Sequence, residues 1–238
     1  MGRGDANLQG LHCMTKMDFG VDWKTAIKCV KKVIKNPEDT KNIFALATAV
    51  NGPSLIKMHH KLLQTKEGGE LASKLPEFAD LYPLLDKCPE GSVGHALLLN
   101  QKYSLESLIR ISKLGTSNSI NARHPYMWVA RRVRDTHDTY HLLTGYKMDS
   151  VLGEGCVAAF TYAQTKSYLW GLIFLSGIWM FKGSPTKIAA LFEAYRRGKK
   201  CVWLLGENYE TMINENLDDC RKRLNLPKAK IYDAISEN

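Results

Sequence analysis

The chain of 238 residues lacks clustered cysteines: it has six, and no two of them form a C-x-x-C pair. The scatter excludes a zinc ribbon and a disulfide framework, and it predicts reduced thiols without disulfide bonds. The six are Cys13, Cys29, Cys88, Cys156, Cys201 and Cys220.

Long apolar runs are also missing. The uncharged apolar stretch Tyr168–Phe181 is shorter than the about 20 residues that a membrane span needs. We expect it to form a buried central helix or, alternatively, a helix that lines a lipid tunnel or touches a bilayer. No secretory signal is visible, so an intracellular location is expected, either cytoplasmic or peripheral on a membrane. Residues 1–17 are polar and glycine-rich and are predicted to be a disordered tail.

Positive charge is in modest excess over negative charge, and the formal net charge is +9. The basic residues occur in short runs, for which a solvated helix face is the simplest explanation. Attraction to an anionic membrane surface or to an acidic ligand is the alternative. The chain carries no nucleic-acid motif, so nucleic acid is not an expected partner. The runs include Lys31-Lys32, Arg131-Arg132, Arg196-Arg197 and Arg221–Arg223.

Alternating strand patterns are absent too, and helical periodicity dominates instead. Apolar residues recur every three to four positions from Trp23 behind Asp22, a good N-cap residue, and Pro37 ends that segment. The predicted fold is an all-α, single-domain helical bundle over residues 18–238. Further helices are expected at 36–50, from Ser54 to a break at Gly68-Gly69, at 103–114, from Pro125 to an end at Gly145, at 184–197 and at 207–224.

Four residues that can bind metals lie close together in the sequence, at His137, Asp138, His141 and Glu154. The two histidines are four apart, so they share one face of a helix. Asp138 lies about 100° around that helix from His137, near enough to join from the side. This combination is more specific than a bare H-x-x-x-H pair and predicts a divalent metal site.

A turn between His141 and Glu154 is expected to bring the two together. Gly145 is a natural residue to end the first helix, and Asp149 or Ser150 a natural N-cap of the next. Such a short connection makes antiparallel neighbours. His141 and Glu154 then lie at about the same distance, 6–7.5 Å, from the turn, and could share one ion across a hairpin.

The identity of the metal and its role stay open. Imidazole favours zinc or iron and carboxylate favours magnesium or manganese, so zinc and magnesium both remain. The pattern is not the H-E-x-x-H of metalloproteases, because Asp138 follows the first histidine. A metal-dependent hydrolase acting on a phosphoester is the alternative function. A third possibility is a scaffold in which the ion only fixes the hairpin.

Two arginines precede the cluster, at Arg131 and Arg134. They could bind the phosphate or carboxylate of a head group, because guanidinium matches both in bidentate geometry. Alternatively they form ion pairs with Asp135 and Asp138. The small residues that follow Glu154 are expected to permit close helix contact, or else to leave room for a ligand.

The residues resemble the ubiquinone-biosynthesis family known as coenzyme Q protein four. Its hallmark, H-D-x-x-H followed by a glutamate after an L-G turn, is similar to His137–His141 and Leu152-Gly153-Glu154. A second family element, P-x-G-S/T-x-G, matches Pro89–Gly94, and the resemblance covers roughly residues 85–225. The segment Leu142–Gly153 is one residue longer than is usual in the family, which marks a divergent, bacterial-like member.

The resemblance implies a helical, membrane-associated protein that organises ubiquinone-synthesising enzymes and binds the prenyl tail of a quinone precursor. It also implies metal-dependent decarboxylation and hydroxylation of the ring; no catalytic residue is assigned. The implied partners are an isoprenoid lipid or prenylated precursor, other enzymes of the pathway, a membrane surface and, as an option, a second copy in a homodimer.

An apolar lipid cavity is expected to begin near the Tyr168–Phe181 segment, about four turns or 20 Å along a helix from Glu154. The candidate lining residues are Phe160, Trp170, Phe174 and Trp179.

Overall fold

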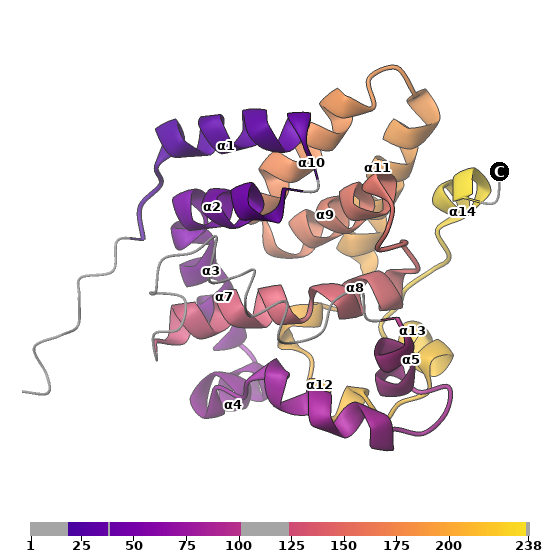
Figure 1. Ribbon diagram of the computed structural model, residues 1–238. Helices are drawn as coiled ribbons and strands as arrows, with labels where there is room; N and C mark the ends of the chain where they lie inside the picture. The colour runs from indigo at the N-terminus through magenta and orange to yellow at the C-terminus, as the bar shows by residue number, and fades with distance from the viewer. Residues whose placement is uncertain (1–18, 38, 101–123, 237–238) are drawn as a thin grey trace, which may run out of the picture.

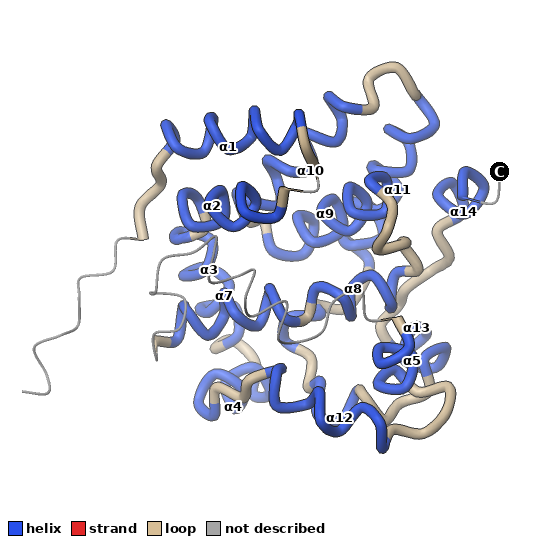
Figure 2. The backbone as a smooth tube through the Cα atoms, in the orientation of Figure 1, coloured by secondary structure: helices blue, strands red, loops and turns tan. Residues whose placement is uncertain are grey.

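The computed structural model describes residues 19–37, 39–100 and 124–236, and every regular element in these ranges is a helix (Figures 1 and 2). One isolated antiparallel bridge, Ser92 to Asn216, is the nearest approach to a sheet among these residues. The all-α prediction is confirmed. The predicted tail at 1–17 and the predicted helix at 103–114 lie outside the described residues.

The elements follow one another as α-helices with two 3-10 segments, η2 and η4. In chain order they are α1 (Trp23–Lys35), α2 (Thr40–Val50), α3 (Gly52–Leu62), α4 (Lys66–Lys74), η2 (Phe78–Lys87), α5 (Val93–Leu99), α7 (Pro125–Asp135), α8 (His137–Thr144), α9 (Val151–Thr165), α10 (Tyr168–Met180), α11 (Pro185–Lys200), η4 (Leu204–Gly206), α12 (Tyr209–Met212), α13 (Leu217–Arg223) and α14 (Lys230–Ser236).

Local capping determines where several helices begin. Asp22 caps α1 as predicted, accepting a hydrogen bond from the Thr25 amide. The second helix begins at Thr40 and not at residue 36, because Asp39 supplies the cap. Pro125 opens α7 as predicted, and Thr136 separates α7 from α8 along one nearly continuous rod (Figure 1).

Two helix boundaries predicted in the N-terminal half of the chain are wrong, and both involve glycines. The third helix begins at Gly52, before the predicted cap residue Ser54. The pair Gly68-Gly69 does not break a helix but lies inside α4, which Thr65 caps. A Cβ at Gly68 would come 2.3 Å from the Leu62 carbonyl oxygen, so this glycine permits a close approach of the backbone at the α3–α4 junction.

The helix predicted at 207–224 is divided into α12 and α13. Between them, the carbonyl oxygens of Ile213 and Glu215 accept hydrogen bonds from the amides of Gly94 and Val93 at the start of α5. These carbonyls are therefore unavailable for a continuous helix, and Asn216 caps α13 anew. The Pro89–Gly94 motif thus has a structural role, docking α5 onto the C-terminal segment.

Helix α9 is the central helix of the described structure, with most of its residues buried. It packs against α10 on one side and α11 on the other (Figure 1). Small residues permit a close contact of α9 with α11, as expected: a Cβ at Gly198 of α11 would lie 2.5 Å from the Phe160 carbonyl oxygen and 2.9 Å from the Cβ of Ala163. Helix α10, predicted to be central, is only half covered, because Leu175 and Trp179 are exposed.

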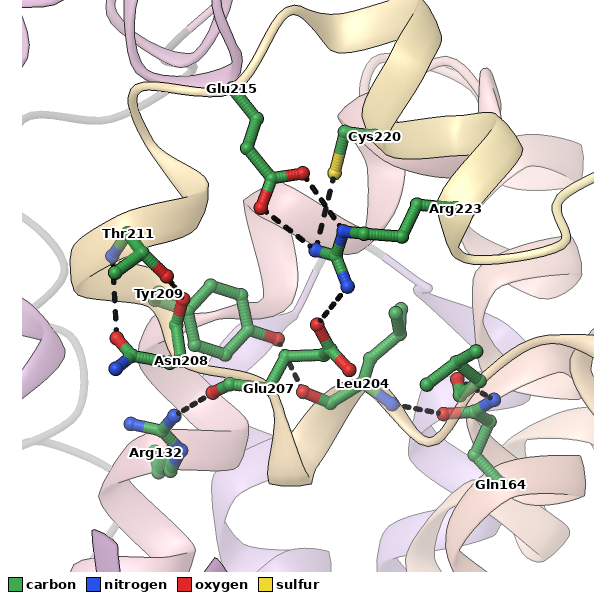
Figure 3. A network of polar contacts seen from close by, with 11 residues as sticks. Arg132, Gln164, Leu204, Glu207, Asn208, Tyr209, Thr211, Glu215, Cys220 and Arg223 are labelled. Atoms are coloured by element: carbon green, nitrogen blue, oxygen red, sulfur yellow. Dashed lines mark hydrogen bonds and ion pairs between the residues drawn. The ribbon is translucent and has the colours of Figure 1, made fainter. Parts of the chain in front are cut away.

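Buried polar side chains fix the segment around η4 to α7 and α9 (Figure 3). The Gln164 amide group on α9 donates to three carbonyls between residues 198 and 202 and accepts from the Leu204 amide. Arg132 on α7 donates to the carbonyls of Leu205 and Glu207, at 3.1 and 2.6 Å. These bonds tie the rod of α7 and α8 to the central helix.

The close approach of Gly153 to the turn before α9 gives a prediction. A Cβ at this position would lie 2.0 Å from the Lys147 carbonyl oxygen, and backbone atoms cannot move away cheaply. We expect Gly153→Ala to lower the free energy of unfolding by about 1–3 kcal/mol, measured by urea denaturation.

The matched control is Gly69→Ala in α4, where an added Cβ meets no atom within 4 Å. That substitution should stabilise the protein by up to about 1 kcal/mol, because alanine is the better helix former. Equal stability of the two variants would contradict the close approach at Gly153.

Candidate metal centre

The hairpin between α8 and α9 forms as the sequence predicts. Gly145 ends α8 in the left-handed region, with φ of +80°, and its amide donates to the His141 carbonyl. Of the two predicted caps, Ser150 is the one used: its hydroxyl accepts from the Gly153 amide at 3.3 Å. The first turn of α9 therefore places Glu154 opposite the two histidines of α8.

Three of the four predicted ligands meet at this hairpin. The Nε2 atoms of His137 and His141 are 3.2 Å apart. The Glu154 Oε2 atom lies 3.3 Å from the first of these nitrogens and 3.4 Å from the second. The three donor atoms thus form a nearly equilateral triangle, and in the described part of the chain no other group of this kind is found.

A backbone contact orients the buried histidine. The Nδ1 atom of His141 lies 3.0 Å from the Tyr146 carbonyl oxygen, which can only accept. A neutral ring in this position carries its proton on Nδ1, which leaves the Nε2 lone pair available to a metal ion. In metalloproteins, a hydrogen bond from the other ring nitrogen to a backbone carbonyl or a carboxylate commonly orients a metal-bound histidine in the same way.

Electrostatics keep the glutamate ionised. Burial favours the protonated form, but hydrogen bonds to His137 and His141 outweigh it and hold the pKa of the Glu154 carboxyl well below its ordinary range. The side chain of Glu154 is 46% exposed, whereas that of His141 is 1% exposed. The triangle therefore contains an anionic donor, and it is accessible from the glutamate side.

The dimensions of the triangle fit a divalent ion. Donors bound at about 2.0–2.1 Å to a tetrahedral zinc ion lie about 3.3–3.4 Å apart, and octahedral coordination brings them slightly closer. The observed edges of 3.2–3.4 Å match this range. Three protein ligands on one side would leave the remaining coordination positions for water or a ligand.

Asp138, the fourth predicted ligand, is not part of the triangle. Its Oδ2 atom is buried without a hydrogen-bond partner among the described residues. Burial and the nearby Asp138 carboxylate both raise the pKa of the Tyr82 phenol, which places the two side chains near each other. Asp138 therefore stays a predicted ligand only, because its carboxylate is not among the donor atoms that converge in the triangle.

Trp170 is a neighbour that the sequence did not reveal. Its ring stacks on His137, with centroids 5.4 Å apart and planes 10° from parallel. The apolar segment was expected to begin about 20 Å away from the cluster, but the chain reverses between α9 and α10. The first turn of α10 therefore contacts a histidine of the candidate metal centre directly. No local pattern signals this contact, because it joins side chains 33 positions apart.

The last turn of α8 is held by two arginines from the C-terminal part of the chain. Arg221 donates to the carbonyls of Leu142 and Leu143, and Arg197 donates to that of Thr144. These carbonyls are ones that a helix end leaves unsatisfied. The basic runs that contain the two arginines were expected to be solvated, but Arg197 is buried and fixes the histidine-bearing helix.

Both arginines proposed for a head group have carboxylate partners. Arg131 forms a bidentate pair with Glu77, which is far away in the sequence. Arg134 pairs with Asp135, as the ion-pair alternative predicted. Desolvation nevertheless raises the pKa of the buried Asp135 carboxyl.

The four candidate lipid-lining residues lie in different surroundings. Phe160 and Phe174 are buried in the core around α9, whereas Trp179 is 55% exposed. Trp170 is partly buried between two smaller clusters, beside the metal site. These side chains do not form one wall, and Trp170 alone among them touches the candidate metal centre.

Comparisons with known proteins agree on one family. The model of the family described as coenzyme Q (ubiquinone) biosynthesis protein Coq4 matches residues 21–230. A mitochondrial COQ4 homologue from Bombyx mori is 25% identical over 198 residues, which cover 78% of this chain and 72% of that protein. The mitochondrial COQ4 of Podospora anserina is 24% identical over 207 residues, 81% of this chain and 64% of that protein.

A solved structure shares the fold. The crystal structure of a protein from Nostoc punctiforme PCC 73102, described as a candidate for ubiquinone biosynthesis, superposes with a TM-score of 0.62. The superposition covers 88% of this chain and 100% of that one, at 21% identity. The likeness therefore extends through nearly the whole helical architecture.

The geometry predicts loss of metal on removal of the histidine pair. We expect His137→Ala with His141→Ala to abolish stoichiometric binding of a divalent metal, because two of the three converging donors are lost. Inductively coupled plasma mass spectrometry of the purified proteins gives the metal content. A folded double variant that keeps one equivalent of metal would rule out this site.

Two further variants make the result specific. His59→Ala with His60→Ala removes the same number of imidazoles from α3 and should leave the metal content unchanged. Glu154→Gln removes one charge from a half-exposed side chain, so it should weaken metal binding while the fold, followed by circular dichroism, is retained.

Proposed function

The chain belongs to the coenzyme Q (ubiquinone) biosynthesis protein Coq4 family, and we propose that it binds an isoprenoid lipid or prenylated quinone precursor of that pathway. A divalent metal, zinc or magnesium, lies at the head-group end of the binding site. The protein acts there as a scaffold or carrier, or in decarboxylation of the ring, together with other enzymes of quinone biosynthesis.

One observation carries this proposal: the donor triangle is in direct contact with an apolar helix. Trp170 of α10 stacks on His137, and the remainder of α10 is rich in aromatic and aliphatic side chains. A ligand with an oxygen-rich head and an apolar tail would meet both surfaces at once. A water-soluble phosphoester would use only the first, which favours the lipid over the hydrolase alternative.

Head and tail would make different contributions. A bound divalent ion supplies positive charge for the oxygens of a head group. His141, oriented by Tyr146, and the ionised Glu154 would hold that charge in place. Burial of each CH₂ group of the tail contributes about 0.8 kcal/mol, so the tail should dominate affinity and the head should decide selectivity.

A surface formed by α1 and α10 suits the membrane partner. No helix in the described ranges has the length and apolar character to cross a membrane. On α1 and α10, however, large apolar side chains are exposed to solvent. The rings of Trp23 and Tyr168 contact each other and join the two helices into the α1–α10 face. Its exposed apolar members are Trp23, Ile27, Tyr168, Leu175 and Trp179.

Lysines accompany this face. Lys24, Lys28 and Lys31 are exposed on α1, and the Lys182 ammonium lies 4.9 Å above the Trp179 ring. Apolar side chains with lysines alongside are typical of helices that lie in the interface of an anionic bilayer. We propose that the α1–α10 face contacts the membrane from which the lipid is taken.

Metal and lipid are expected to bind cooperatively. We would titrate the protein with geranylgeranyl phosphate, geranylgeraniol and a short-chain prenyl phosphate, with and without EDTA. Chelation should weaken binding of geranylgeranyl phosphate more than that of the alcohol, because only the phosphate contacts the ion strongly. The short-chain phosphate should bind weakly throughout, since most of the apolar contact is missing.

Other outcomes separate the alternatives. Glu154→Ala should reduce the preference between the two long-chain ligands more than it reduces binding of geranylgeraniol. If chelation leaves all three affinities unchanged in a folded protein, the ion is structural and the proposal fails. Release of inorganic phosphate during the titration would instead support the hydrolase.

Membrane contact gives a separate prediction. Leu175→Gln with Trp179→Gln should weaken binding to vesicles of phosphatidylcholine and phosphatidylglycerol by about tenfold or more, because two large apolar side chains no longer enter the interface. Leu63→Gln with Leu99→Gln removes exposed leucines from other surfaces and should have little effect. Equal vesicle binding by both variants, measured by co-sedimentation, would exclude this face.

A further inference from the structure

A second candidate site lies in a pocket of about 260 Å³ between α11 and α14. The segment that leads into α14 closes one side of it. Basic side chains dominate its lining, which consists of Glu193, Arg196, Arg197, Lys200, Pro227, Lys228, Lys230 and Ile231. Lys230 is the last residue matched by the family model, so this pocket lies at the edge of the family's common region.

The single carboxylate of the lining, that of Glu193, is engaged with the backbone. It accepts hydrogen bonds from the amides of Ile231 and Tyr232 in the first turn of α14. Glu193 therefore anchors α14 to α11, and it forms no ion pair with the cations around it among the described residues. One negative charge thus faces five positive ones in the same pocket.

The five cations have no carboxylate partner in the described part of the chain, although the neighbouring basic run is fully paired. Arg221, Lys222 and Arg223 each form ion pairs with acidic residues of the C-terminal segment. Intrachain pairing thus accounts for the basic run in α13 but not for the basic residues of the pocket. The pocket therefore carries an excess of positive charge that no ion pair among the described residues compensates.

Arg197 supplies the fixed part of the pocket. It is only 5% exposed, and its Nε and Nη2 atoms donate to the carbonyls of Pro227 and Thr144. Its guanidinium lies 4.9 Å above the Tyr146 ring. The remaining Nη1 atom is buried and makes no hydrogen bond in the described structure. A buried guanidinium nitrogen without a partner is costly unless an acceptor is supplied from elsewhere.

We propose that this pocket binds a phosphate group, carried either by a lipid head group or by a soluble small molecule. Arginine and lysine form their strongest hydrogen bonds with phosphate and carboxylate oxygens. The volume suits a compact anion better than a length of acidic peptide. The site is separate from the metal centre, so the inference goes beyond the proposed function and does not depend on it.

The test uses the full chain and exposed side chains. Lys228→Gln with Lys230→Gln removes two cations of the pocket and leaves Arg197, which fixes α8, unchanged. Lys66→Gln with Lys74→Gln on α4 makes the same change of charge on another surface. Binding of inorganic phosphate is measured by calorimetry in the presence of EDTA, so that an ion at the metal centre contributes nothing.

Phosphate should bind to the wild type and to the α4 control with similar affinity. The pocket variant should bind about tenfold more weakly, as expected on loss of two charge-assisted hydrogen bonds. Circular dichroism and metal content should be the same in all three proteins. A failure of the metal proposal would show in the metal content and would leave this comparison intact.

A second measurement identifies the source of the phosphate. Co-sedimentation with phosphatidylcholine vesicles, with and without phosphatidylglycerol, is compared for the same three proteins. A loss confined to the pocket variant and to the anionic vesicles assigns the site to a lipid head group. Normal vesicle binding with weakened phosphate binding assigns it to a soluble phosphate. If the pocket variant matches the α4 control in both measurements, the proposal is overturned.

Discussion

The structure around the candidate metal centre depends on the α8–α9 turn, which must hold two imidazole nitrogens and one carboxylate oxygen within 3.4 Å of one another. Without an ion, this arrangement brings two nitrogen acceptors and an anionic oxygen together, and the three atoms cannot all receive hydrogen bonds from one another. The backbone nevertheless gives them little freedom. The turn requires a left-handed backbone conformation at Gly145, and Gly153 lies against the Lys147 carbonyl with no room for a side chain.

The surrounding helices stabilise this arrangement through bonds to the end of α8. Arg197 and Arg221 satisfy carbonyls of its last turn, and the Tyr146 carbonyl orients His141. Further along the rod, Arg132 ties α7 to the segment around η4, which Gln164 ties to α9 (Figure 3). The positions of the candidate ligands thus depend on hydrogen bonds to the carbonyls at the end of α8, since each buried carbonyl without a hydrogen bond would cost free energy.

Arg197 also connects parts of the molecule that have different chemistry. Its guanidinium contacts Tyr146 and the Thr144 carbonyl on one side, and it belongs to the basic pocket near α14 on the other. The apolar α1–α10 face is formed by other helices, but Trp170 brings α10 to the same metal centre. The proposed membrane-facing, metal-binding and anion-binding surfaces are therefore all linked to the α8–α9 hairpin by side-chain contacts.

The sequence by itself determined the helical class and the local design of the hairpin. Spacing placed His137 and His141 on one face, and the Gly145 end and Ser150 cap set Glu154 level with them, because these signals act within a few residues. Only the tertiary structure decided that Arg131 pairs with Glu77, that Arg197 is buried and that Trp170 stacks on His137. It also decided that residues 207–224 form two helices, since α5 takes the carbonyls between them. Such partners are distant in the chain, and packing alone brings them together.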